Sequence, residues 1–300
     1  MNIQTISIVV PTKGCVNKCP FCVSRMHDSP YENNWNDVQM IKRIHYAVMN
    51  NVNTCIITGT GEPFQNPSFL NKLSMLFRRM DSPFPNIEFQ TTGVFLSESE
   101  RDFDNFAYRK EDPPIYKNIK VLQAIGVNTI SLSVADIFDD GMNNKIIGIP
   151  QGLEFYLYNL IQLLKKNGFN IRLSLNLTMN YEGKSVTDII ERAKYLGADQ
   201  ITFRKLYYLD NDEFSLQSYW VKENSATPDF LGRVDDTIKA VGKALYRLPF
   251  GPIVYSIWGM SVVIDDDCMN KTNHEVLKYV ILRENGKLYS QWDDVGSLIF

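Results

Sequence analysis

The feature of this sequence that most constrains its fold is a regular alternation of strand-like and helix-like stretches over the first two-thirds. The strand-like runs are short, apolar and rich in β-branched residues, and they lie at 5–12, 54–59, 86–93, 129–136, 171–179 and 200–207. Such runs suit parallel strands that are buried on both faces, which need not alternate polar with apolar residues.

Stretches with helical periodicity separate these runs, at 36–49, 67–80, 116–125, 151–167 and 185–196. In the first, Asn36 followed by Gln39 resembles a capping box. Its expected apolar face is formed by Val38, Ile41, Ile44 and Val48. Three helices are expected to end in a left-handed glycine just before the next strand, at Gly126, Gly168 and Gly197. Six consecutive βα units indicate an α/β fold with a parallel barrel-like or open sheet, whose chemistry gathers at the carboxyl ends of the strands.

The pattern changes after residue 208. Residues 209–228 show no clear element and are expected to form a loop or an insertion, and 229–247 are expected to form one more helix. Strands are expected within 251–267 and 278–294, with a hairpin turn at Asn285-Gly286. We therefore expect a core at 1–208 and a C-terminal α+β extension at 209–300, which closes the barrel or covers the substrate site.

Composition narrows the class of protein. The 300 residues carry a net charge of −3 with a sequence pI of about 5.7, and no long basic run occurs. Binding to extended nucleic acid, which depends on phosphate contacts, is therefore not expected. No run of about 18 apolar residues predicts a membrane span, and the N-terminal residues do not resemble a signal peptide. A cytoplasmic location is expected, and the odd count of 5 cysteines argues against a disulfide framework.

Three of the cysteines lie within eight positions, directly after the first expected strand: Cys15, Cys19 and Cys22. Thiolates are soft ligands that select zinc, copper(I) or iron–sulfur clusters. A structural zinc site needs four ligands, yet no second C-x₂-C pair occurs and His27 is poorly spaced to be the fourth. A redox pair of Cys19 and Cys22 would leave Cys15 unexplained. The spacing favours an iron–sulfur cluster over these two alternatives, which remain open at this point.

The other two cysteines have different surroundings. Cys55 lies in the apolar run TCIIT and is expected to pack in the core. Cys268 follows Asp265, Asp266 and Asp267, which are expected to form a solvated acidic turn rather than a cation site. Neither cysteine is expected to be a cluster ligand.

The C-x₃-C-x₂-C spacing, with Phe21 before the last cysteine, resembles the signature of the radical S-adenosylmethionine (SAM) enzymes. A second motif agrees with it: TGTGEP at 58–63 ends the second expected strand and resembles the Gly-Gly-Glu-Pro motif of that family. Aligning Gly61-Glu62 places Thr60 where the family has the first of the paired glycines. The resemblance implies a partial (β/α)₆, TIM-like barrel of parallel strands over about residues 1–208.

The resemblance also implies the chemistry. Cys15, Cys19 and Cys22 would hold a [4Fe–4S] cluster and leave one iron to bind the amino and carboxylate groups of SAM. One electron from the reduced cluster would cleave SAM, and the resulting 5′-deoxyadenosyl radical would remove hydrogen from a substrate. An external one-electron reductant of the flavodoxin or ferredoxin type would supply the electron.

Further contacts with SAM follow from the same resemblance. Gly59, Thr60, Gly61 and Glu62 match the segment that holds the SAM amino group. Phe21 would lie near the adenine, and Thr92 near SAM at the end of the third strand. Ser133 and Asn176 would contact the ribose or carboxylate, or would simply satisfy backbone groups at strand ends. Arg204 would meet a carboxylate or phosphate, or would be the partner in a structural ion pair.

The sequence does not name the substrate. Because only two cysteines lie outside the group of three, a second cluster is not expected, and this disfavours peptide-maturing relatives with cysteine-rich extensions. The near-neutral charge favours a small molecule or a nucleotide. Modification of RNA or of a peptide is the alternative. A non-catalytic zinc- or iron–sulfur-binding module is the alternative from another class.

Overall fold

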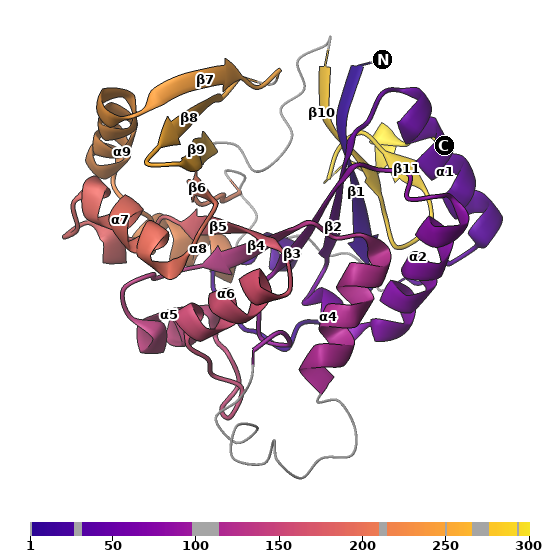
Figure 1. Ribbon diagram of the computed structural model, residues 1–300, viewed down its shortest axis with the longest axis horizontal. Coiled ribbons are helices and arrows are strands. Elements are labelled where there is room, and N and C mark those ends of the chain that lie inside the picture. The colour runs from indigo at the N-terminus through magenta and orange to yellow at the C-terminus, as the bar shows by residue number, and fades with distance from the viewer. Residues whose placement is uncertain are drawn as a thin grey trace. The chain divides into compact units, whose positions relative to one another are not determined.

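The computed structural model describes residues 2–26, 32–97, 114–209, 215–249, 251–265, 276–292 and 294–300 (Figure 1). The chain divides into two compact units. The first comprises Met1–Val16, Ser29–Ile130 and Met269–Phe300, and the second comprises Asn17–Asp28 and Ser131–Cys268. The predicted division into 1–208 and 209–300 stays a prediction.

The first unit is built on strands in the order β11-β10-β1-β2-β3. Their bounds are Asn2–Val10 for β1, Thr54–Gly59 for β2, Asn86–Thr91 for β3, Val276–Leu282 for β10 and Leu288–Tyr289 for β11. The strands β10, β1, β2 and β3 pair in parallel, and β11 pairs antiparallel with β10. The predicted hairpin turn is confirmed, because Gly286 has a φ of 74° and its N–H donates to Arg283 O at 2.9 Å.

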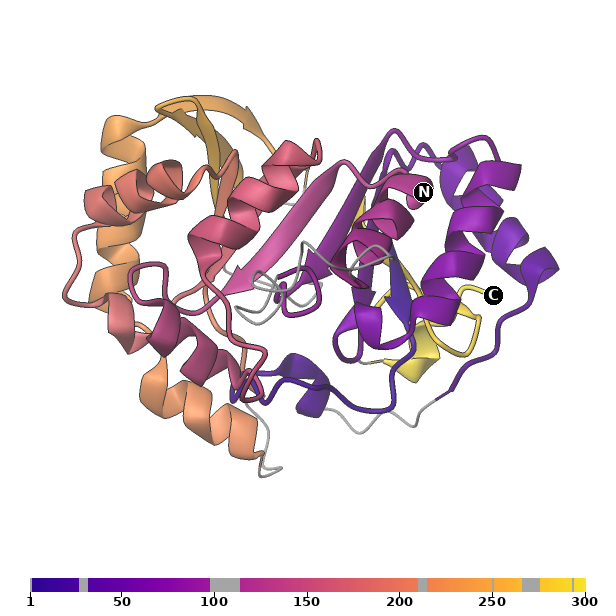
Figure 2. The same cartoon turned by 60° about the horizontal axis from the view of Figure 1, so that its bottom comes forward.

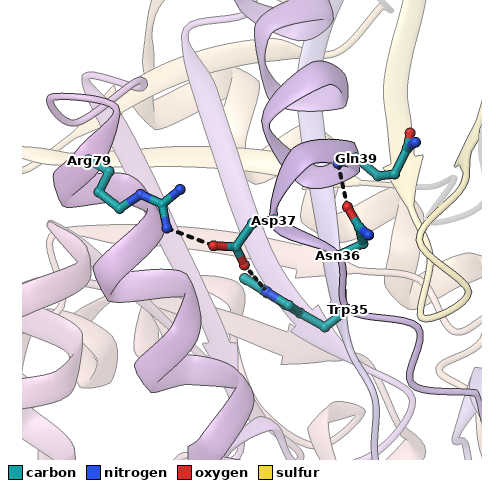
Figure 3. Close-up of polar contacts among 5 residues, drawn as sticks. All are labelled: Trp35, Asn36, Asp37, Gln39 and Arg79. Carbon is teal, nitrogen blue, oxygen red and sulfur yellow. Dashed lines mark hydrogen bonds and ion pairs between the residues drawn. The ribbon is translucent and has the colours of Figure 1, made fainter.

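The helices α1 (Asp37–Met49), α2 (Pro67–Arg79) and α4 (Pro114–Ile125) follow the first three strands and cover one face of this sheet (Figure 1). The predicted start of α1 is confirmed, since the Asn36 side chain accepts a hydrogen bond from Gln39 N at 3.0 Å (Figure 3). In the same view Asp37 accepts from the Trp35 indole and pairs with Arg79 of α2 at 2.6 Å, which ties α1 to α2.

The apolar face predicted for α1 is wrong in part. Ile44 is buried, but Val38 and Val48 are 59% and 41% exposed. The face that packs inward is formed by Met40, Arg43, Ile44 and Ala47. Arg43 can lie on this inward face because its guanidinium makes a cation–π contact, 5.3 Å from the centroid of the Phe300 ring. A hydrophobic pattern does not predict a buried arginine.

The second unit is built on strands in the order β4-β5-β6-β9-β8-β7. Their bounds are Thr129–Val134 for β4, Asn170–Asn176 for β5, Gln200–Arg204 for β6, Lys243–Arg247 for β7, Ile253–Ile257 for β8 and Met260–Asp265 for β9. The strands β5, β6 and β9 pair in parallel, and β8 and β7 continue antiparallel. The helices that accompany them are α5 (Asp140–Ile147), α6 (Leu157–Lys166), α7 (Val186–Leu196), α8 (Leu216–Asn224) and α9 (Pro228–Val241).

All six predicted βα strands are present, and Gly126, Gly168 and Gly197 have φ values of 90°, 87° and 98°, as predicted. The helix predicted at 151–167 begins only at Leu157, and α5 was not predicted. The stretch expected to be a loop at 209–228 contains α8, and the helix expected at 229–247 ends at Val241 and is followed by β7. Within the described ranges, no helix is long and apolar enough to cross a membrane.

Candidate active site

The loop after β1 carries the three closely spaced cysteines. The thiols of Cys15, Cys19 and Cys22 are partly buried, whereas Cys55 in β2 is fully buried. Burial raises the pKa of the Cys55 thiol, so it favours the protonated form that does not ligate metals. The prediction that Cys55 packs in the core is confirmed, while Cys268 lies outside the described residues.

Among the residues that the structure describes, no three His, Cys, Asp or Glu side chains gather closely enough to form a metal site. The joint ligation of one cluster by the three cysteines therefore rests on their spacing and stays a prediction. The donor set itself fits an iron–sulfur cluster, because soft thiolates are the ligands that such clusters use.

The second motif packs directly against the start of this loop, within the first unit. A Cβ atom at Gly61 would lie 2.4 Å from Gly14 O, 2.6 Å from Thr12 Oγ1 and 3.1 Å from Cys15 Cα. Only glycine lets the two backbones approach so closely. The hydroxyls of Thr12 and Thr60 are also hydrogen-bonded, at 3.2 Å. The structure therefore brings the GTGEP segment against the start of the cysteine loop.

Two residues just beyond the motif also hold the loop, and the sequence did not single them out. The Gln65 side-chain oxygen accepts a hydrogen bond from Val16 N at 2.8 Å. Asn66 caps α2 by accepting from Phe69 N, and its amide donates to Pro11 O at 2.8 Å. Asn66 could have been found from the sequence, because asparagine is a preferred N-cap residue and it directly precedes the helix expected at 67–80. Nothing local in the sequence marks Gln65, whose partner lies 49 positions away.

Glu62 is buried, and its carboxylate is held by threonines at the end of β3. It accepts from Thr91 Oγ1 at 2.6 Å, from Thr92 N at 3.1 Å and from Thr92 Oγ1 at 3.0 Å. Burial raises the pKa of Glu62, and these hydrogen bonds oppose that rise only in part. Glu62 and Thr92, both predicted to lie near SAM, are thus in direct contact with each other.

The second part of the cysteine loop belongs to the second unit. Cys22 N donates to Cys19 O at 3.3 Å, and Lys18 N donates to the carbonyl oxygens of Ile147 and Gly148 at the end of α5. Phe21 is buried, and its ring centroid lies 6.0 Å from that of Trp220. The structure gives Phe21 a packing role, and its contact with adenine stays a prediction.

The remaining predicted residues lie at the ends of β4, β5 and β6. Asn176 donates to Ser133 Oγ at 2.9 Å and to Val134 O at 3.2 Å, so the two predicted residues meet and one backbone group is satisfied. Arg204 donates from Nε to Ser174 Oγ at 2.9 Å and lies 3.5 Å from the Asp265 carboxylate. Asp265 is therefore an ion-pair partner at the end of β9, which corrects the expectation of a solvated turn at that residue.

The family model of the radical SAM superfamily matches residues 9–196. The chain therefore belongs to the radical SAM superfamily, whose members use a [4Fe–4S] cluster and SAM as cofactors. A comparison with curated protein sequences finds no match.

Solved structures share the fold. SuiB from Streptococcus suis, bound to the precursor peptide SuiA, is 12% identical with a TM-score of 0.54 over 97% of this chain and 60% of that chain. Native anSMEcpe with bound AdoMet and Kp18Cys peptide is 14% identical with a TM-score of 0.56, over 96% of this chain and 74% of that chain. A histidine-tagged form of anSMEcpe with bound AdoMet is 17% identical with a TM-score of 0.52, over 80% of this chain and 60% of that chain.

These likenesses confirm the predicted α/β fold, a partial TIM-like barrel with mostly parallel strands. At these identities they concern the fold alone. The chain spans 60% of the length of the SuiB chain.

Proposed function

We propose that this chain cleaves SAM reductively at a [4Fe–4S] cluster held by Cys15, Cys19 and Cys22. Cys15, Cys19 and Cys22 would hold the cluster, which would supply the electron for this cleavage and so the radical chemistry that removes a hydrogen atom from the substrate. The observation that carries the proposal is the packing of Gly61 against Gly14 and Cys15, which joins the second family motif to the cysteine loop.

The chain's own residues would orient SAM and limit water access. The backbone of Gly59, Thr60 and Gly61 would lie along the SAM amino group, and the Glu62 carboxylate would accept from it. Thr91 and Thr92 already aim that carboxylate, so its direction is set before SAM arrives. Contacts of Phe21, Thr92, Ser133, Asn176 and Arg204 with SAM or substrate are part of the same proposal.

The proposed substrate is a small molecule or a nucleotide, as the near-neutral charge favours. A peptide is the second candidate, because SuiB is bound to a precursor peptide and anSMEcpe to the Kp18Cys peptide, and both cover nearly all of this chain. The proposal also includes an external one-electron reductant, a cytoplasmic location, and a role for 209–300 in closing the barrel or covering the substrate site.

The test is anaerobic reconstitution with iron and sulfide, followed by incubation with SAM and dithionite. We expect roughly four iron and four sulfide per chain, as the cluster type requires, together with formation of 5′-deoxyadenosine. Replacing Cys15, Cys19 and Cys22 with alanine should abolish both, while Cys55→Ala, the matched control at a buried cysteine, should keep them. Full iron content in the triple variant would exclude the proposed ligands.

A second experiment separates the two substrate candidates. The reconstituted protein is incubated with SAM and reductant, in parallel, against a small-molecule fraction and a peptide fraction of one cell extract. Loss of a compound from the small-molecule fraction that depends on SAM supports a small molecule or nucleotide as the substrate. Loss confined to the peptide fraction supports a peptide in its place.

A further inference from the structure

The end of α5 holds the cysteine loop at a point between two of the predicted ligands. Lys18 N donates to Ile147 O at 3.2 Å and to Gly148 O at 3.1 Å. Figure 2 brings this region forward, where the indigo segment that follows β1 meets the loop that follows α5. Two carbonyl groups that the helix leaves without an intrahelical donor are thus used to fix the backbone just before Cys19.

The approach depends on the absence of a side chain at position 148. Gly148 ends α5 in the left-handed region, with φ 68° and ψ 45°, and its N–H donates back into the last turn. A Cβ atom there would lie 2.8 Å from Lys18 Cβ and 3.0 Å from both Lys18 C and Lys18 Cα. Since two of these three atoms belong to the backbone of the loop, the loop itself would have to move.

The helix that carries Gly148 is itself firmly placed. Asn143 of α5 is buried, and its side-chain oxygen accepts from Ala135 N at 2.9 Å and from Asp136 N at 3.3 Å, directly after β4. Ile147 belongs to the same hydrophobic cluster as Phe21, against which Cys19 also packs. The position of the loop is thereby linked, through α5, to the end of a strand.

We infer that α5 and its terminal Gly148 form a positioning element for the cluster loop, an inference that rests on the proposed function. The helix sets where the Cys19 and Cys22 thiols can lie, and hence the geometry of two of the three ligands. Ligand geometry and the hydrogen bonds around a cluster tune its retention and its reduction potential.

The test compares two glycines that both have a left-handed φ near the end of a helix. Gly168 follows Asn167, the C-cap of α6, with φ 87°, but a Cβ there meets nothing within 4 Å. Asparagine tolerates the left-handed region, so Gly148→Asn and Gly168→Asn add a Cβ at similar backbone strain. Iron and sulfide content, the electron paramagnetic resonance spectrum of the reduced cluster with and without SAM, and SAM affinity are measured for both variants and for the parent.

We expect Gly168→Asn to match the parent in every cluster property. Gly148→Asn should retain several-fold less iron, or should show an altered spectrum and several-fold weaker SAM binding. Adding Lys18→Gly removes the nearest clashing atom and should restore part of the loss. If Gly148→Asn does not fold, Gly148→Ala, which adds the Cβ atom alone, is measured against Gly168→Ala: loss of iron confined to Gly148→Ala supports the inference, and parental cluster properties in it overturn the inference.

Equal cluster properties in the two asparagine variants would also overturn the inference. That outcome is distinct from failure of the proposed function, which would show in the parent as a lack of iron that depends on Cys15, Cys19 and Cys22.

Discussion

Thr91 Oγ1 donates a hydrogen bond of 2.6 Å to the carboxylate of Glu62, and both residues are buried. One residue ends β3, and the other lies in the motif after β2. The bond joins neighbouring strand ends of the first unit at the carboxyl edge of its sheet, where a parallel α/β fold places its chemistry.

This arrangement predicts a pH dependence of stability. Burial raises the pKa of Glu62 above its ordinary value of 4.5, so the folded state binds this proton more tightly than the unfolded state does. The stability that this difference provides is fully present below the ordinary pKa and is lost as the pH rises through the raised one. Glu62→Gln should remove that loss.

The measurement is the free energy of unfolding in urea, for parent and Glu62→Gln, from a pH near the ordinary pKa of 4.5 upward. Relative to the variant, the parent should become less stable as the pH rises. A difference between the two proteins that does not change with pH would show that the carboxyl titrates alike in the folded and unfolded chains.

The close packing at Gly61 predicts that adding one methyl group there lowers the stability of the protein. Gly61→Ala should destabilise the protein by about 1–3 kcal/mol, the usual cost of overpacking, because Gly14 O would lie 2.4 Å from the new Cβ. Gly183→Ala is the control, since a Cβ there meets nothing within 4 Å. Thermal or urea unfolding measures both, and equal losses would mean that the Gly61 contact relaxes at no cost.

Two asparagine caps of the first unit allow a matched comparison. Asn36 caps α1 (Figure 3), and Asn66 caps α2 while also donating to Pro11 O. Asn36→Ala should cost about 1 kcal/mol for the cap alone. Asn66→Ala should cost about 0.5–1.5 kcal/mol more, since it removes the link to Pro11 as well.

Asn66→Asp separates the two roles of Asn66. Aspartate keeps the oxygen that caps α2 but loses the amide that donates to Pro11 O. Its free energy of unfolding should therefore fall by the second contribution, about 0.5–1.5 kcal/mol, while the cap is kept. If Asn66→Asp were as stable as the parent, the hydrogen bond to Pro11 O would contribute nothing to stability.

The sequence predicted the strands better than the helices, for a physical reason. Each βα strand lies in a short run rich in apolar and β-branched residues, and the observed β2 has the expected bounds of 54–59 because polar residues flank the run on both sides. The helix α5 has few apolar residues and no clear period. It begins because Asp139 accepts from Met142 N at 2.9 Å, and it is held by Asn143, and neither contact shows in a hydrophobic pattern.

Some residues of the candidate site could likewise be predicted from the sequence, and others could not. Cys15, Cys19, Cys22 and the GTGEP segment could be found because spacing within one short stretch carries their chemistry. Gln65 and Gly148 could not be found. Each acts on a loop that is distant in sequence, and only the fold brings the two backbones together.

The pair of Arg204 and Asp265 gives the last prediction. The two side chains are 27% and 13% exposed, and their charged groups lie 3.5 Å apart. A partly exposed pair contributes roughly 0.2–1 kcal/mol, and residues in contact are not additive when both are changed. Arg204→Gln and Asp265→Asn should therefore show a coupling of that size in a double-mutant cycle of unfolding free energies.

SAM affinity of the same variants then decides whether Arg204 has a second role. If Arg204 only pairs with Asp265, both single variants should bind SAM alike. If its guanidinium also meets a carboxylate or phosphate, Arg204→Gln alone should weaken binding, while Asp265→Asn leaves the cation in place and keeps the affinity. Purely additive unfolding energies, with parental SAM affinity in both variants, would contradict the ion pair and the ligand contact together.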